Sequence, residues 1–555
     1  MMQERTRQVL LLILLIAAVL RLWNIGTIPQ WDYDEGTIMN ISWNLLHGKF
    51  LLFNLKYPFV PHPPFFYMVT AGLLAIFGND LVALRVLAAL CSVATVFFLY
   101  KIGRELSNPN LGLVTAFLYA IYPNDIFFSR IGFANNMIAL ISVAAVYCFI
   151  RYRKENKTQW LYYASAITGI AIVTEFIAVA LFVSIILRLL PRERKHIPVV
   201  SLISLAPVAL FAVVMLTIMP DAFITDFSHQ FVRLRDWEGA NVNAASNSIG
   251  LLLLALFALA IYRMKDYLKA LYGVSLWCFI SLVHPGISMK GSRKIATDTL
   301  FMILLSLNVF IAAASLSPYS DDMFFNGLKD YFIIGFLGVF LIRKERFRDV
   351  VLIFFLTMLF LFVKVNRADH MVLLLYPYFC IGLAFLLHWT YHYANSLGGS
   401  KLASASVLLL LSYPFAFIAI HDVSAFVIGQ GISSQNVKDT LAAADYLNRN
   451  TNVTDIVVTD DHTMRFLHAR TADYVHCFII DHKRFVYADP NLGPERFVFN
   501  SSYRNVKYFV LSKRNTAEFS RLGESNPDIM DVMDEVRKWP VHEVGTYSVY
   551  RNPGL

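Results

Sequence analysis

Residues 9–20 read VLLLILLIAAVL, an unbroken apolar run that is followed directly by Arg21. Comparable apolar blocks recur along the chain, and each approaches the ~20 residues that a helix needs to cross a bilayer. The blocks do not alternate apolar with polar residues, as the strands of a membrane β-barrel do. The sequence therefore predicts a polytopic α-helical membrane protein with about 13 spans.

The composition agrees with a membrane protein. Of the 555 residues, 57% are hydrophobic and 16% are charged, whereas soluble domains carry ~25% charged residues. The net charge of +9 is explained by basic clusters beyond apolar blocks, at 151–154, 192–195 and 343–346, where the positive-inside rule expects them. No basic stripe interleaved with aromatic residues is present, so nucleic-acid binding is not expected. The five cysteines show no disulfide or metal-type spacing.

The chain is expected to divide into two parts. Residues 1–429 would form the membrane domain, with an uncleaved first span, a cytoplasmic N-terminus and a long outer loop over about 26–65. Residues 65–77 are short for a crossing and predict a helix along the membrane surface. The basic turn at 343–348 favours an odd number of spans and an outside C-terminus. One segment between 249 and 342 is therefore expected not to cross the membrane. The later spans are expected at roughly 80–101, 110–123, 134–150, 160–174, 176–190, 196–219, 249–262, 268–284, 298–316, 327–342, 349–364, 370–392 and 402–425.

The composition changes near residue 430. Residues 430–555 contain 15 Lys/Arg and 16 Asp/Glu, the charge content of a soluble domain. Helical spacing over 437–447, short strands at 455–459 and 506–511, and a strand or hairpin arm at 543–550 predict a small α/β domain. It has no glycine-rich phosphate loop and no nucleophile elbow, so we expect it to help place a substrate rather than to carry chemistry.

The first outer loop carries three carboxylates in four residues, Asp32, Asp34 and Glu35. A helix is expected over 37–46, ending at Gly48. Two interpretations are open. Asp34 could cap this helix with Glu35 in its first turn, or the carboxylates could serve chemistry. Capping accounts for Asp34 but gives no reason for Asp32.

Other charged residues also stand near the outer ends of spans. Prolines on both sides of His62 either fix its imidazole in place or simply return the chain to the membrane. Arg130 shares a loop with Asp125 on the side where cations are rarer, so the positive-inside rule does not explain it. Arg85 is expected to snorkel to the interface and is left outside the site. Glu175 is expected at a hairpin tip, because a charge at mid-membrane is costly.

In this order, these segments resemble the GT-C glycosyltransferase superfamily, in particular its branch of protein O-mannosyltransferases and lipid A aminoarabinose transferases. The resemblance covers about residues 9–150 and continues weakly to 425. It departs at the second acid, where Asn135 (or Asn136) stands in place of the usual Asp and Asp125 could substitute. The family motifs are matched by Asp34-Glu35, His62-Pro63-Pro64, Phe77-Gly78 with Arg85, Ser129-Arg130, and Arg367-Ala368-Asp369-His370.

The resemblance implies that a sugar moves from a polyprenyl-phosphate donor to a protein, lipid or glycan acceptor, with inversion at the anomeric carbon. Such a transfer needs a base for the acceptor hydroxyl and cations for the departing phosphate. The implied base is Asp34, with Glu35 supporting it or binding the acceptor. The implied phosphate-binding residues are Arg130, Arg367, His370 and His62, and the acceptor-binding or supporting residues are Asp32, Asp125 and Asn135. A divalent metal held by Asp32, Asp34, Glu35 and His62 is left open, and no other cofactor is expected.

Two other functions stay open. An oligosaccharyltransferase would carry a Trp-Trp-Asp-Tyr-Gly motif in its C-terminal domain, whereas residues 430–555 contain a single tryptophan, Trp539. A lipid or solute transporter would tend to show repeated halves, and no internal repeat is found. The sequence thus favours a multi-pass glycosyltransferase of the cell membrane whose active site and C-terminal domain face the outside.

Overall fold

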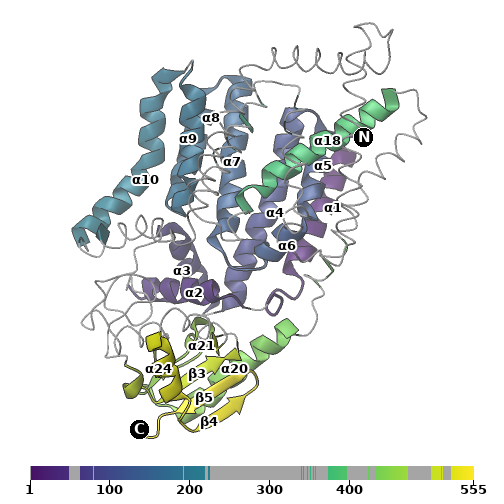
Figure 1. Cartoon of the computed structure of the whole chain (residues 1–555). Coiled ribbons are helices and arrows are strands. Elements are labelled where there is room, and N and C mark those ends of the chain that lie inside the picture. Colours follow the sequence, from purple (N-terminus) through teal and green to yellow (C-terminus); the bar gives the residue numbers. More distant parts are fainter. Residues whose placement is uncertain are drawn as a thin grey trace, which may run out of the picture.

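The computed structural model describes residues 2–29, 31–48, 63–78, 80–191, 193–218, 373–396, 432–472, 502–513 and 527–555, with single residues between these ranges. A bundle of long helices lies on one side of a small part built around a sheet (Figure 1). The N-terminus lies at the end of the bundle that is remote from the sheet, and the C-terminus lies beside the sheet (Figure 1).

The helical bundle starts with α1 (Met2–Leu22), which contains the expected first span. The spans expected at 80–101, 110–123, 134–150, 160–174, 176–190, 196–219 and 370–392 also coincide with helices, whereas most of the others lie outside the described residues. The further elements are α2 (Tyr33–Leu46), α3 (Phe65–Phe77), α4 (Leu81–Leu106), α5 (Pro109–Ala120), α6 (Pro123–Ser129), α7 (Ala134–Glu155), α8 (Thr158–Ile172), the 3₁₀ turn η1 (Phe176–Ala178), α9 (Val179–Leu189), η2 (Arg194–His196), α10 (Ile197–Ile218) and α18 (Tyr376–Ser396).

Length and hydropathy identify the helices that can cross a membrane. Within the described ranges these are α4, α7 and the stretch 194–218, with α5 and α6 as a fourth if the pair is one bent span. The bend of 60° falls at Pro123, which begins α6, because proline lacks an N–H group and suits the first turn of a helix. Helices α3 and α9 are apolar but shorter. The total of about 13 spans remains a prediction.

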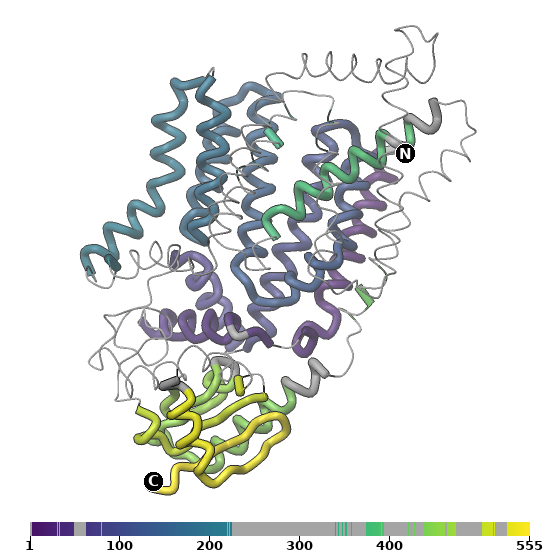
Figure 2. Tube along the Cα trace, viewed as in Figure 1, coloured from purple at the N-terminus to yellow at the C-terminus, as the bar shows by residue number. Residues whose placement is uncertain are grey.

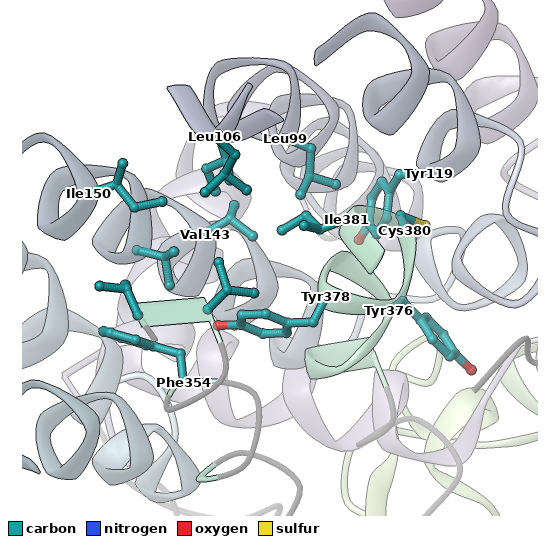
Figure 3. Packing of buried hydrophobic residues seen from close by; sticks show 14 of the residues in the cluster. Leu99, Leu106, Tyr119, Val143, Ile150, Phe354, Tyr376, Tyr378, Cys380 and Ile381 are labelled. Carbon is teal, nitrogen blue, oxygen red and sulfur yellow. The ribbon is translucent and has the colours of Figure 1, made fainter. Parts of the chain in front are cut away.

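Apolar side chains fill the centre of the bundle (Figure 3). Leu99 of α4, Val143 of α7 and Ile381 of α18 are buried in one cluster. Helices α4 and α5 approach closely where two glycines meet, since a Cβ atom on Gly103 of α4 would lie 2.8 Å from the Cα atom of Gly112 on α5. Small residues at helix contacts are typical of membrane bundles, where dispersion contacts replace the hydrophobic effect.

The C-terminal part contains a five-stranded sheet of order β2-β1-β3-β5-β4. Strands β2 and β3 run parallel to β1, whereas β5 is antiparallel to β3 and β4 is antiparallel to β5. The expected helix at 437–447, both expected strands and the final hairpin are present, but β2, α21 and α24 were not foreseen. The elements are α20 (Ile432–Asn450), β1 (Ile456–Val458), α21 (Asp461–Met464), β2 (Arg470–Ala472), η6 (Tyr503–Asn505), β3 (Tyr508–Ser512), α24 (Pro527–Val536), β4 (Val541–Val544) and β5 (Tyr547–Arg551).

Both faces of this sheet are covered by helices. Successive side chains of a strand point to opposite faces, so Val458 packs with Met533 of α24 while its neighbour Val457 packs with Leu447 of α20. Burial on both faces explains why the strands read as continuous apolar runs.

The sheet lies against the start of the chain. In Figure 2 the green and yellow C-terminal trace lies directly below the purple segment of α2, and α21 packs on α2. The first acidic loop and the C-terminal part therefore share one side of the bundle.

Candidate active site

The acidic loop forms the N-terminus of α2, and its cap is Asp32. The side chain of Asp32 accepts a hydrogen bond of 3.1 Å from the N–H of Asp34, and Glu35 accepts one of 2.9 Å from the N–H of Asp32. This capping box satisfies the free N–H groups of the first turn. Of the two interpretations, the one in which Asp34 caps the helix is therefore wrong. Because Asp32 provides the cap, the exposed carboxylate of Asp34 is not needed for it.

Glu35 is completely buried and holds four hydrogen bonds. Arg85 donates through Nε at 2.7 Å and through a terminal nitrogen at 2.6 Å, so the pair is bidentate. The N–H groups of Gly132 and Asp32 supply the other two. The expectation that Arg85 snorkels to the interface is wrong, because its side chain is 0% exposed. With its oxygens occupied, Glu35 supports the loop and is not placed to bind an acceptor.

Asp125 belongs to a second buried ion pair. Its carboxylate accepts hydrogen bonds of 2.6 Å from Arg21, Ser92 and Tyr119, and its side chain is 1% exposed. It joins the ends of α1 and α5 and the middle of α4 to α6. This placement excludes Asp125 as a substitute for the family's second acid.

Arg130 is also buried, and it donates to backbone carbonyl oxygens. Its guanidinium contacts the oxygens of Leu20 at 2.9 Å, Trp23 at 2.6 Å and Ile28 at 3.0 Å, and thereby fixes the segment that leaves α1. A guanidinium at 0% exposure with these partners is not placed to bind a lipid phosphate, so the prediction for Arg130 needs correction.

One of the two asparagines at the start of α7 has a structural role. The amide of Asn136 donates to the carbonyl oxygens of Phe128, Ile131 and Phe133. A carboxylate has no N–H and could not make these bonds. Asn135 is 5% exposed at the start of α7, so it too lies within the fold.

Asp34 lies near a phenol and a second carboxylate. Tyr67 on α3 is buried, and burial followed by the charges of Glu175 and Asp34 raises the pKa of its hydroxyl. Glu175 occupies the turn between α8 and η1, as expected for a hairpin tip, and its side chain does not cap η1. The N–H of Phe65 donates to the oxygen of Val173 at 3.0 Å, which ties this turn to α3. Two carboxylates from distant segments thus act on one hydroxyl.

The C-terminal part also contacts the acidic loop. The ring of Phe466, just after α21, stacks on Trp31 with 5.4 Å between centroids, and the Trp31 indole N–H donates to Gly26. The aromatic contact therefore lies one residue before the helix cap Asp32.

Several predicted residues remain untested. His62, Arg367 and His370 lie outside the described residues. Asp32 serves as a cap and Glu35 is paired, so the set suggested for a metal retains Asp34 with its carboxylate exposed. In the ranges that the structure describes, no three His, Cys, Asp or Glu side chains form a metal-type group.

Comparison with known proteins identifies the fold. Residues 61–220 match the family model of dolichyl-phosphate-mannose-protein mannosyltransferases, and no curated protein matches the chain. ArnT from Cupriavidus metallidurans superimposes with a TM-score of 0.53 at 12% identity, covering 98% of this chain and 97% of that one. The chain has the GT-C glycosyltransferase fold. The oligosaccharyltransferase AglB from Archaeoglobus fulgidus, in complex with an inhibitory peptide and a dolichol-phosphate, shares this fold with a TM-score of 0.54 at 14% identity. That superposition covers 100% of this chain and 75% of AglB.

The GT-C fold extends over both parts of the chain, since ArnT and this protein cover each other almost completely. The family model, by contrast, matches the stretch from the end of the first outer loop through α10. Sequence reasoning did not include Arg85 and Tyr67 in the candidate site. Arg85 was expected to snorkel to the membrane interface, and Tyr67 lies on the apolar helix α3. The cost of a charge at mid-membrane predicted a hairpin tip at Glu175, and Glu175 lies in the turn before η1.

Proposed function

We propose that this protein is a membrane glycosyltransferase that moves a sugar from a polyprenyl-phosphate donor to an acceptor hydroxyl at the face formed by α2, α3 and α21. The proposal is supported by the GT-C fold and by the match to a family described by a dolichyl-phosphate-linked donor. AglB, which shares the fold, is described as bound to dolichol-phosphate. The observation that carries the proposal is the exposed Asp34 beside this face, whose capping task Asp32 performs.

Asp34 acts as the general base. The acceptor oxygen attacks the anomeric carbon, its proton passes to the Asp34 carboxylate, and the bond from carbon to the donor phosphate oxygen breaks. The electron pair of that bond leaves with the polyprenyl phosphate, and the configuration at the anomeric carbon is inverted. Asp32 and Glu35 hold the loop through the capping box, and Arg85 anchors Glu35.

Glu175 is the second carboxylate of the site. It acts on the same phenol as Asp34, and so offers a second acid in a chain that has Asn135 in place of the family's second acid. We assign it the binding of a hydroxyl on the sugar or acceptor, because a carboxylate accepts strong hydrogen bonds from such groups.

The experiment compares Asp34→Asn with Asp32→Asn. Both remove one charge from the loop, and asparagine at position 32 still caps a helix. The assay uses membranes that hold the natural acceptors and a radiolabelled polyprenyl-phosphate mannose. We expect Asp34→Asn to slow release of lipid phosphate ~10²–10⁴-fold, the usual contribution of general acid–base catalysis. Wild-type turnover in Asp34→Asn would remove Asp34 from the chemistry.

The active face is proposed to lie outside the cell. Basic residues gather at the far end of α7, where Arg151 and Arg153 pair with Glu155 and Glu193, and such clusters favour the cytoplasm. In a variant without the five native cysteines, an impermeant maleimide should label His47→Cys and Lys538→Cys in intact cells. Lys157→Cys, which is exposed beyond α7, should react after permeabilisation. The opposite pattern would invert the orientation.

Oligosaccharyl transfer is the second candidate, because AglB shares the fold over the whole chain. An acceptor peptide with an Asn-X-Thr sequon distinguishes the two functions. Transfer of a whole glycan to asparagine in that peptide supports the second candidate, and transfer of a single sugar to a hydroxyl supports the first.

A further inference from the structure

The end of the helical bundle that is remote from the sheet carries basic side chains on α4 and α7 (Figure 1). Residues 101–106 and 151–157 contain six basic and two acidic residues. Lys154 of α7 donates to Glu105 of α4 at 2.6 Å, so the two helices end side by side. This cluster lies about 30 Å along α4 from Arg85, well away from the proposed active face.

Glu105 does not balance the cations around it. It is 6% exposed, pairs with Lys154 and lies 3.5 Å from Arg104. Lys101 stands one turn before Arg104 on the same face of α4 and makes no ion pair with any residue that the structure describes. Arg104 and Arg151 both act against the charge on Lys101, and Glu105 opposes them more weakly.

The other carboxylates near this end are also paired. Glu155 binds Arg151 and lies 3.5 Å from Lys157, and Glu193, just before η2, binds Arg153. These two acids and Glu105 stand against the six cations of the cluster, so the surplus is three positive charges. Like charges that are held together repel one another, and an anion from outside the protein would relieve this repulsion.

The basic residues of α4 continue a lipid-facing stripe. Leu90, Phe97, Lys101 and Arg104 are spaced by seven, four and three positions and therefore share one face of the helix. Leu90 is 52% exposed and Phe97 is 36% exposed. The ammonium of Lys101 lies 5.0 Å from the centre of the Phe97 ring, so the apolar part of the stripe leads directly to the cations.

Aromatic side chains of the neighbouring helices mark the same level. The Arg151 guanidinium lies 4.7 Å from the centre of the Trp160 ring, and Tyr163, one turn further along α8, is 54% exposed. Tryptophan and tyrosine are enriched where a bilayer meets water. The cations therefore lie at the depth of lipid headgroups, above a surface that acyl chains can cover.

We propose that Lys101, Arg104 and Arg151 form a binding site for the headgroup of an anionic phospholipid in the adjacent leaflet. The lipid phosphate accepts charge-assisted hydrogen bonds from these side chains, and an acyl chain follows Leu90 and Phe97 along α4. A zwitterionic lipid brings a cation of its own and would restore the repulsion. The site is separate from the proposed active face and does not depend on the proposed function.

Native mass spectrometry of the full chain in detergent, titrated with phosphatidylglycerol or phosphatidylcholine, tests the proposal. Replacing Lys101 and Arg104 together by Gln should weaken binding of the first phosphatidylglycerol ~10–30-fold, at about fivefold for each cation near a membrane surface. Binding of phosphatidylcholine should not change. Glu105 keeps its bond to Lys154 in this variant, so the buried acid is not left alone.

The matched control is Arg194→Gln with Lys195→Gln. Both residues are exposed in η2, beside the Glu193 that binds Arg153, so the control removes the same charge from the surface outside the proposed site. It should bind phosphatidylglycerol as the wild type does. Equal weakening in the two double variants would indicate diffuse attraction to the net charge and would overturn the proposal.

Two further arms test the roles of charge and of the acyl chains. Lys101→Arg with Arg104→Lys keeps both charges and should bind nearly as the wild type does, and a loss as large as with Gln would indicate packing and contradict the site. Glycerol 1-phosphate, which has the phosphate without acyl chains, should not displace phosphatidylglycerol. Displacement would mean that the cations bind a free anion, against the lipid assignment.

Discussion

The segments after α1 and after α5 contain the same kinds of residue and use them in opposite ways. In the second segment Asp125 and Arg130 are buried and bound to partners inside the fold. In the first, Glu35 is buried likewise, but Asp34 one position before it is exposed. A charged residue that is buried with its partners serves the scaffold, whereas the exposed neighbour lies where a substrate can reach it.

The largest effect that tests this comparison is expected from Arg85→Leu. It leaves the Glu35 carboxylate charged in the interior, and breaking a buried pair in this way costs about 3–5 kcal/mol. Thermal unfolding of the detergent-solubilised protein should show a markedly lower Tm. Glu35→Gln added to Arg85→Leu should recover part of the loss, because no buried charge remains.

The control is Arg104→Leu, whose partly exposed pair with Glu105 is 3.5 Å long and should contribute less than ~1 kcal/mol. Equal Tm values for Arg85→Leu and Arg104→Leu would contradict the scaffold role.

Arg130→Gln is expected to be the next most harmful change. Carbonyl oxygens after α1 lose a charged donor, at a cost of about 1.5–3 kcal/mol. The same variant should bind undecaprenyl phosphate with wild-type affinity. Weaker binding at an unchanged Tm would reverse the comparison and return Arg130 to the donor site.

Glu175→Gln tests whether a carboxylate outside the two compared segments contributes to turnover. The amide keeps the shape of the side chain but loses the charge, and we expect turnover to fall ~10-fold, equivalent to ~1.4 kcal/mol in the barrier. The Tm is measured beside turnover, because a structural role of Glu175 would lower both together. The control is Glu4→Gln at the exposed start of α1, and equal turnover in the two variants would remove Glu175 from the site.

The smallest effect concerns a surface pair in the sheet. Burial raises the pKa of Asp455, but Lys507 at 2.8 Å and the N–H of Asn452 outweigh it and hold the pKa below its usual value. The pair therefore stabilises the fold above the unfolded pKa of ~3.9, and this contribution is lost as the pH falls through the folded pKa. Asp455→Asn should cost less than ~1 kcal/mol at pH 7 and progressively less in acid. Hydrogen exchange of β1 and β3 amides in the whole protein measures this, and a difference that grows in acid would have the wrong sign.

Local patterns were sufficient to predict most of the elements. Apolar runs located α4, α7 and α10, and the short strands around Val457 and Phe509 followed from their buried composition. The acidic loop was also predicted to be a site, and this stays a prediction. Its cap was misplaced by two residues, because aspartate suits position 32 and position 34 equally well by type and the choice depends on where α2 begins.

Pairings between distant segments could not be predicted. Arg85 and Glu35 are separated by 50 positions, and a lone arginine near the end of an apolar block has the same sequence pattern whether it snorkels or pairs. The contact of α21 with α2 likewise follows from the tertiary fold and from no local signal.

The stacking of Trp31 on Phe466 also has a consequence for biosynthesis. The two rings are ~430 residues apart, and at ~5–20 residues per second a ribosome needs about 20–90 s to make the chain between them. Throughout that interval the nascent protein has its acidic loop but not the segment that covers it. Translation order thus keeps each new molecule incomplete until almost its whole length has been made, and a chain truncated before residue 466 never acquires this contact.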